Sequence, residues 1–139
     1  RFEMEIALIE EDLPVADVPG LWNEKFEQFF GFAIEKDTDG CLQDIHWSGG
    51  GIGYFPTYTL GNLYGAQFYA KAESELGDLE SEFAAGRFCG LKDWLTERIY
   101  RQGMRLLPKD LVQEVTGTSL SHVPLVAHLE SKYSRLYGI

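Results

Sequence analysis

The sequence has few cysteines and no long apolar run, and these two features narrow the class of protein. Its 139 residues include two cysteines, Cys41 and Cys89, too few for a disulfide framework and typical of a reducing compartment. No stretch of about 18 apolar residues indicates a membrane-spanning helix, and no pattern indicates a secretory signal peptide. We therefore expect a cytoplasmic protein that does not enter a membrane.

Basic residues are scarce as well. Twelve lysines and arginines stand against 22 aspartates and glutamates, for a net charge of −10. Phosphate binding needs clustered basic side chains, so nucleic acid is a disfavoured partner. The acidic residues are spread over several segments, which indicates a solvated acidic surface more than a cation-binding patch. The chain is 45% hydrophobic and 14% aromatic, a composition that predicts a folded domain with a core.

Short metal-binding patterns are also missing. The chain has neither an HExxH nor a CxxC motif, the two spacings that place metal ligands on one face. His122 and His128 are six residues apart and would fall on different faces of a helix. Cys41 and His46 are five apart and would fall on opposite faces of an extended segment. No metal site is predicted within this chain, and Cys41 with His46 makes a poor nucleophile pair.

What is present is a strong helical pattern. Phe2, Ile6 and Ile9 already follow helical spacing with no capping residue ahead of them, which indicates the C-terminal piece of a longer chain, or else a processed N-terminus. Loop signals end this first helix near Glu11. Further helices are predicted at Gly20–Phe30, Pro56–Leu76, Asp78–Phe88, Leu91–Gln102, Pro108–Val115 and Val123–Tyr137.

The predicted fold class is all-α, with residues 1–139 forming a single C-terminal helical part of a longer chain. The helix at Pro56–Leu76 carries apolar residues on most sides, which predicts a central and largely buried position. Leu42–Trp47 alternates between apolar and polar residues, so it is predicted to be one short extended segment.

The most unusual chemistry lies between Gly40 and Gly65, which reads GCLQDIHWSGGGIGYFPTYTLGNLYG. In an extended Leu42–Trp47, Asp44 and His46 would share one face. Asp44 would then fix the imidazole tautomer and leave the second ring nitrogen free to react. A structural hydrogen-bonded pair is the alternative interpretation.

Tyr54 follows eight residues after His46, across a turn that contains four glycines, and directly precedes the helix predicted from Pro56. The N-terminus of a helix favours negative charge nearby, so a phenol donor there would stabilise an oxyanion. An aromatic side chain that packs against the core beside Phe55 is the alternative.

Gly40 to Trp47 resembles the GxxQDxHW motif of the M32 metallocarboxypeptidases, the Taq-carboxypeptidase family. The continuation GYFPTYTLGNLYGAQ, the segment GLKDWL, the VTG turn and the closing SKYSRLYGI are also similar to that family. The resemblance implies a soluble, mostly helical, zinc-dependent peptidase of the gluzincin kind that releases residues from peptide C-termini. Its architecture would be similar to that of neurolysin and angiotensin-converting enzyme.

The family's HExxH zinc motif lies upstream of the segment that matches this chain, so the resemblance implies that residues 1–139 are the C-terminal part of a larger metallocarboxypeptidase catalytic domain. The resemblance therefore implies that the zinc ligands and the glutamate base belong to a missing N-terminal part, and that this chain alone is inactive. It further implies a site in which His46 binds the substrate or the tetrahedral intermediate and Tyr54 donates to the oxyanion. The supporting or substrate-binding residues would be Asp44, Gln43, Trp47 and Tyr58.

Two other functions stay open. One is a non-catalytic helical interaction module derived from the peptidase. The other is thiol chemistry at Cys41, which requires a lowered thiol pKa. Apolar surface left uncovered on the first helix and at the cleft would also allow self-association, so a homodimer is a further expected partner beside the peptide substrate.

Overall fold

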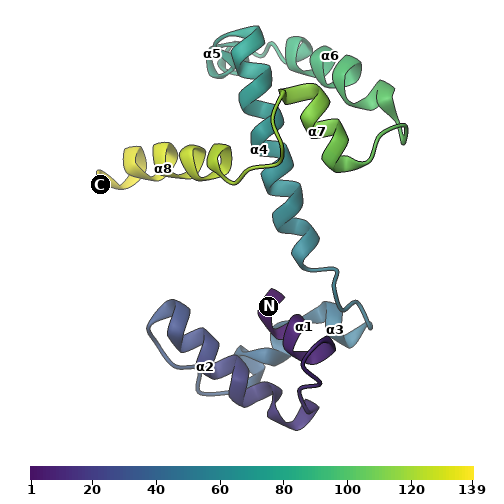
Figure 1. Cartoon of the computed structure of the whole chain (residues 1–139). Helices are drawn as coiled ribbons and strands as arrows, with labels where there is room; N and C mark the ends of the chain where they lie inside the picture. Colours follow the sequence, from purple (N-terminus) through teal and green to yellow (C-terminus); the bar gives the residue numbers. More distant parts are fainter. The chain divides into compact units, whose positions relative to one another are not determined.

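The computed structural model describes all 139 residues, and every regular element in it is helical (Figure 1). Short 3-10 turns occur at Val15–Asp17, Asp37–Asp39, Cys41–Gln43 and Tyr100–Gln102. The α-helices are α1 (Phe2–Ile9), α2 (Val18–Phe30), α3 (Ile45–Ser48), α4 (Pro56–Leu76), α5 (Leu79–Ala84), α6 (Cys89–Arg98), α7 (Pro108–Thr116) and α8 (Val123–Tyr137). The all-α prediction is confirmed.

None of these helices combines the length and the apolar character that crossing a membrane would require.

Proline and glycine set the helix ends that the sequence located best. α4 begins at Pro56, where a missing N–H costs nothing. α8 ends before Gly138, whose φ of 70° is left-handed, and α7 ends before Gly117 in the same way. α5 stops at Ala84, four residues earlier than predicted, because the chain turns at Gly86 with φ of 72°.

The prediction of an extended segment at Leu42–Trp47 is wrong. The chain forms a 3-10 turn over Cys41–Gln43 and then the short helix α3, and Asp44 between them has the extended backbone angles φ −82° and ψ 104°. The reason is local. The Asp44 side chain accepts hydrogen bonds from the backbone amides of His46 and Trp47, which is the geometry of a helix N-cap. Alternation over six residues does not distinguish such a capped turn from a strand.

The chain divides into two compact units, Arg1–Thr59 and Leu60–Ile139, called here the N-terminal and C-terminal units. The core of the N-terminal unit is formed by Met4, Val18, Trp22 and Cys41. The core of the C-terminal unit is formed by Ala72, Leu79, Trp94 and Val115. The description of residues 1–139 as one part of a larger catalytic domain stays a prediction.

The prediction that α4 is largely buried is wrong for this chain. Gln67 and Ala72 are the buried residues of α4, whereas Leu60 is 45% exposed. Most sides of α4 carry apolar residues of its own. In the C-terminal unit, however, the core residues pack on the side that carries Phe68, Tyr69 and Ala72. Of the other apolar side chains of α4, Leu63, Tyr64 and Ala66 are half-buried, and Tyr58, Leu60 and Leu76 are exposed.

Candidate functional site

The candidate site is built around His46 in the N-terminal unit, and Asp44 determines how that histidine is held. One carboxylate oxygen of Asp44, Oδ1, accepts the backbone amide of His46 at 2.7 Å and that of Trp47 at 3.2 Å. The same oxygen lies 3.1 Å from the ring nitrogen Nδ1 of His46. The Asp44 side chain is fully buried, so this pairing is shielded from water.

The charge of Asp44 fixes the roles in this contact. Burial by itself would raise the pKa of Asp44, but the amides of His46 and Trp47, the His46 ring and the charge of Arg1 together lower it. Asp44 is therefore an ionised acceptor at neutral pH, and Nδ1 of His46 carries the donated proton. The opposite ring nitrogen, Nε2, is left for other partners.

Aromatic residues surround the free side of the His46 ring. Its centroid lies 5.5 Å from that of Tyr54 and 5.7 Å from those of Phe55 and Tyr58. The hydroxyl of Tyr58 is 3.4 Å from Nε2 of His46. Tyr54 and Tyr58 are 54% and 51% exposed, so the phenols beside His46 can reach a ligand.

Tyr58 remains a proton donor in this setting. Partial loss of surrounding water and then the adjacent phenol of Tyr54 raise the pKa of Tyr58 above its ordinary value. Its hydroxyl therefore keeps its proton at neutral pH and can donate toward Nε2 of His46 or toward a bound ligand.

A glycine-rich turn brings Tyr54 back beside His46. The amide of Gly51 donates to the carbonyl oxygen of His46 at 2.7 Å, and a Cβ at Gly51 would lie 3.2 Å from that oxygen. Gly53 has φ of +83°, a left-handed conformation that other residues adopt at a cost. The hydroxyl of Thr57 donates to the Tyr54 carbonyl at 2.7 Å and so fixes the start of α4.

Two of the predicted supporting residues point elsewhere. Gln43 donates its side-chain amide to the carbonyl of Thr38. The indole of Trp47 donates to Oε1 of the buried Glu5 at 3.0 Å and packs edge-on against Trp22 at 5.8 Å. Asp44, His46, Tyr54 and Tyr58 come together, whereas Gln43 and Trp47 fasten the motif to the rest of the N-terminal unit.

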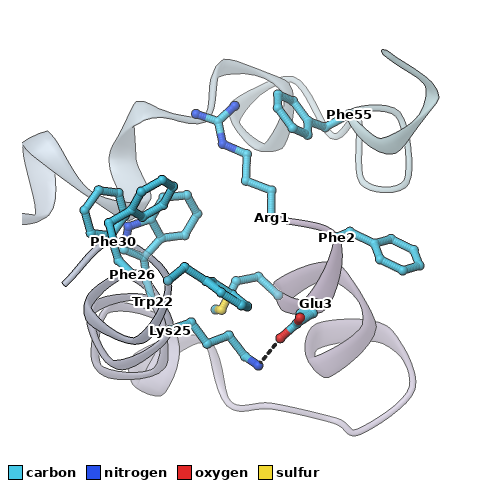
Figure 2. A pocket seen from close by; sticks show the side chains of 10 residues that line it. Arg1, Phe2, Glu3, Trp22, Lys25, Phe26, Phe30 and Phe55 are labelled. Carbon is cyan, nitrogen blue, oxygen red and sulfur yellow. Dashed lines mark hydrogen bonds and ion pairs between the residues drawn. The ribbon is translucent and has the colours of Figure 1, made fainter. Parts of the chain in front are cut away.

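Arg1 and Phe55 also belong to the site, and sequence reasoning missed both. Nη1 of Arg1 lies 3.4 Å from Oδ2 of Asp44, and the guanidinium lies 4.4 Å from the centroid of the Phe55 ring (Figure 2). Arg1 is far from Asp44 along the chain, so no local pattern signals the contact. Phe55 could have been found from its position next to Tyr54, but an aromatic beside a helix start looks the same in the core.

A cavity of about 490 Å³ adjoins these residues within the N-terminal unit. Figure 2 shows Arg1 and Phe55 on one side of it and the aromatic side chains of α2 on the other. The lining includes Phe2, Trp22, Phe26, Phe30, Arg1 and Phe55.

The residues of this chain do not fit a metal centre, because nowhere do three histidine, cysteine, aspartate or glutamate side chains gather. The structure also disfavours a thiol nucleophile at Cys41. That side chain is 6% exposed, and burial, followed by the charge of Asp37, raises the pKa of the Cys41 thiol. A raised pKa keeps the thiol protonated and unreactive.

Comparisons with known proteins agree with the helical fold. Residues 1–133 match the family model described as Carboxypeptidase Taq (M32) metallopeptidase. Thermostable carboxypeptidase 1 of Thermus thermophilus is 51% identical over 99% of this chain, and Carboxypeptidase 1 of Bacillus subtilis is 39% identical over the same share. The crystal structure of the M32 carboxypeptidase from Deinococcus radiodurans R1 is 42% identical over 99% of the chain, with a TM-score of 0.92.

These matches define an all-helical segment of the metallopeptidase class. The chain belongs to the M32 family of metallopeptidases. It spans 27% of the length of the two curated relatives and 28% of the Deinococcus chain.

Proposed function

We propose that this chain is one part of a metal-dependent carboxypeptidase and forms one wall of its peptide-binding site. Its family membership and its carboxypeptidase relatives support this function. The chain corresponds to 27% of those relatives, so we expect it to be inactive alone. Zinc is the metal we propose, held by residues outside this chain, because the side chains here do not fit a metal centre.

The single observation that carries the proposal is the way His46 is held. Its Nδ1 is bound by the buried Asp44, and its Nε2 lies 3.4 Å from the hydroxyl of the exposed Tyr58. A ring fixed on one nitrogen presents the other in a defined direction, which suits hydrogen bonding to a peptide. His46 and Tyr54 are the residues we propose as catalytic. Tyr54 would donate to the substrate oxygen that gains negative charge.

The remaining site residues have supporting roles in this proposal. Asp44 orients His46, and Tyr58 contacts either His46 or the substrate. Gln43 and Trp47 hold the segment in place through Thr38 and Glu5. The expected partners are a peptide, the rest of the same protein and a second copy in a homodimer, in a cytoplasmic setting.

The experiment measures release of the C-terminal residue from a blocked dipeptide or tripeptide by the whole protein that carries this chain. His46→Ala and Tyr54→Phe should each lower kcat by at least about tenfold, and loss of an oxyanion donor typically costs about 10²–10³. Tyr133→Phe is the matched control, since Tyr133 is a partly exposed phenol of α8, in the C-terminal unit. A whole protein that releases no C-terminal residue would overturn the proposed activity.

One observation favours a second function, the non-catalytic interaction module. Phe29, Phe30 and Phe32 are each at least 60% exposed, and clustered exposed aromatics often mark a binding surface. The same assay separates the two functions. An interaction module would give no turnover in the whole protein, whereas in a peptidase these aromatics would be covered by the remainder of the enzyme.

A further inference from the structure

We propose that Arg1 is a positioning residue for His46, acting through the buried carboxylate of Asp44. The inference rests on the proposed function for its consequence in catalysis. Its structural part, a cation that keeps Asp44 and hence His46 in place, does not depend on the reaction.

The two oxygens of the Asp44 carboxylate have very different surroundings. Oδ1 accepts the amides of His46 and Trp47 and faces Nδ1 of His46. Oδ2 is buried and accepts no hydrogen bond. Its charged neighbour is Nη1 of Arg1 at 3.4 Å, a separation at which the ion pair is electrostatic without a well-aligned hydrogen bond.

A buried carboxylate needs such a charge. Ionised groups removed from water are costly unless they are paired. The Asp44 side chain is fully buried, while that of Arg1 is 26% exposed. Arg1 therefore supplies the positive charge and still keeps part of its own contact with water. Without it, the carboxylate would be stabilised by the His46 ring and two amides alone.

Arg1 also contacts the aromatic wall of the site. Its guanidinium lies 4.4 Å from the centroid of Phe55 and 5.9 Å from that of Trp22. Phe55 in turn packs against the His46 ring at 5.7 Å. A flat guanidinium can stack on an aromatic face and pair with a carboxylate at once, which a lysine ammonium does less well. Arg1 is thus linked to His46 by two routes, through Asp44 and through Phe55; Figure 2 shows its guanidinium beside Phe55.

The second basic side chain that lines this cavity, Lys25, already has an acidic partner. Nζ of Lys25 pairs with Oε2 of Glu3 (Figure 2), and Lys25 makes no ion pair with Asp44. It is therefore not a ready substitute for Arg1.

The test compares Arg1→Met and Arg1→Lys in the whole protein. Arg1→Met should lower kcat by about tenfold with KM changed less than about twofold, because a positioning residue affects the reacting geometry more than binding. Arg1→Lys keeps the charge and should recover kcat to within about threefold of the parent. The matched control is Arg98→Met, which removes another arginine–carboxylate pair, with Glu75 in the C-terminal unit, and should leave kcat unchanged.

Two further measurements show whether Arg1 acts through Asp44. In an Asp44→Asn background, Arg1→Met should lower kcat by less than about twofold, since the residue it pairs with no longer carries a charge. Nitrogen-15 NMR of the His46 ring in the neutral form should show a proton on Nδ1 in the parent and a mixture of both tautomers in Arg1→Met.

The outcomes separate this inference from the proposed function. If His46→Ala lowers kcat but Arg1→Met changes neither kcat nor the His46 tautomer, the inference about Arg1 is wrong and the proposed function stands. If His46→Ala has no effect on activity, the proposed function fails, and the NMR measurement still decides the structural role of Arg1. If Arg1→Met does not fold, Arg1→Lys decides: a folded lysine variant with a mixed tautomer would overturn the role of the charge.

Discussion

The carboxylate of Asp44 holds His46 at two points, its backbone amide at 2.7 Å and its ring nitrogen Nδ1 at 3.1 Å. One oxygen atom therefore both starts the helix α3 and orients the imidazole. Because the two tasks share an acceptor, a change at Asp44 alters the local backbone and the histidine together. Stability and activity should respond to Asp44 in parallel.

The first prediction concerns Asp44→Asn. Loss of the charge should lower the free energy of unfolding of this chain by about 1–3 kcal/mol, because buried donors lose a charged acceptor and Arg1 loses its partner. In the whole protein kcat should also fall. Asp78→Asn is a matched control: Asp78 caps α5 by accepting the amide of Ser81 at 3.0 Å but is exposed. Urea unfolding of both variants checks this, and equal losses would contradict the role of burial.

The second prediction is the pH dependence of that stability. The pKa of Asp44 is lower in the folded chain than its ordinary value of 3.8. A lowered folded pKa stabilises the protein above the unfolded pKa and loses that effect as pH falls through the folded pKa. The difference in unfolding free energy between the parent and Asp44→Asn should thus shrink as the pH falls below about pH 4.

Unfolding titrations of the two proteins at a series of pH values measure this difference. Other carboxylates cancel, since both proteins contain them. A difference that grows as the pH falls would mean that the pKa of Asp44 is not lowered on folding.

Some of the fold follows from the sequence because the signals are local. Pro56 and Gly138 determine where α4 starts and where α8 stops, through one backbone restriction and one left-handed φ. The motif around His46 is different. Its helical turn forms because the Asp44 side chain accepts the backbone amides of the residues that follow it. The alternation of apolar and polar residues in the sequence favoured an extended segment instead.

The pairing of Asp44 with His46 follows from their spacing, although the expected backbone was wrong, because both a strand and a capped turn place them together. The contact of Arg1 with Asp44 does not follow, since it joins two distant segments. Burial of α4 was overestimated, because an apolar pattern shows which faces need cover and not which chain supplies it.

A third prediction concerns the turn between α3 and α4. Gly53→Ala should lower the unfolding free energy by about 1–2 kcal/mol, because φ of +83° is left-handed, and should lower kcat by displacing Tyr54. Gly61→Ala is the control, since Gly61 lies inside α4 with nothing within 4 Å of an added Cβ. It should raise the stability of this chain by up to about 1 kcal/mol. Thermal unfolding of both variants checks the opposite signs.

A fourth prediction concerns Gln67, which ties α4 to the segment after α7. Its side-chain amide donates to Oγ1 of Thr118 at 2.9 Å and to the carbonyl of Ser119 at 3.0 Å, and its oxygen accepts the amide of Ser121 at 2.9 Å. Gln67→Leu should cost about 2–3 kcal/mol of unfolding free energy, because it removes these three hydrogen bonds of a buried side chain. Hydrogen exchange of the Ser121 amide should speed up.

Gln113→Leu is the control for Gln67, because its side-chain bonds to Gly117 and Ser119 are exposed. It should change stability by less than about 0.5 kcal/mol. Equal losses of unfolding free energy in the two leucine variants would contradict a stabilising role for the hydrogen bonds of the buried Gln67.

A fifth prediction concerns the two thiols. Cys89 is exposed at the start of α6, whereas Cys41 is buried and its pKa is raised by burial. Iodoacetamide should therefore alkylate Cys89 in the folded protein and leave Cys41 unmodified until urea is added. Peptide mass spectrometry after brief labelling measures both. Rapid labelling of Cys41 in the folded protein would contradict this prediction and support a reactive thiol at Cys41.

The surroundings of the His46 ring come from three places in the chain: the capping residue Asp44, the arginine at position 1 that pairs with Asp44, and the aromatic pair Tyr54 and Phe55 just before α4. A designer who transplants the eight residues Gly40–Trp47 into another scaffold would carry over the capped turn and little else. The imidazole would be tethered on one nitrogen beside a carboxylate with no counter-charge. A transplant of the whole arrangement has to include Arg1, Tyr54 and Phe55 as well, so the smallest portable version of this site is a three-segment arrangement and not a sequence motif.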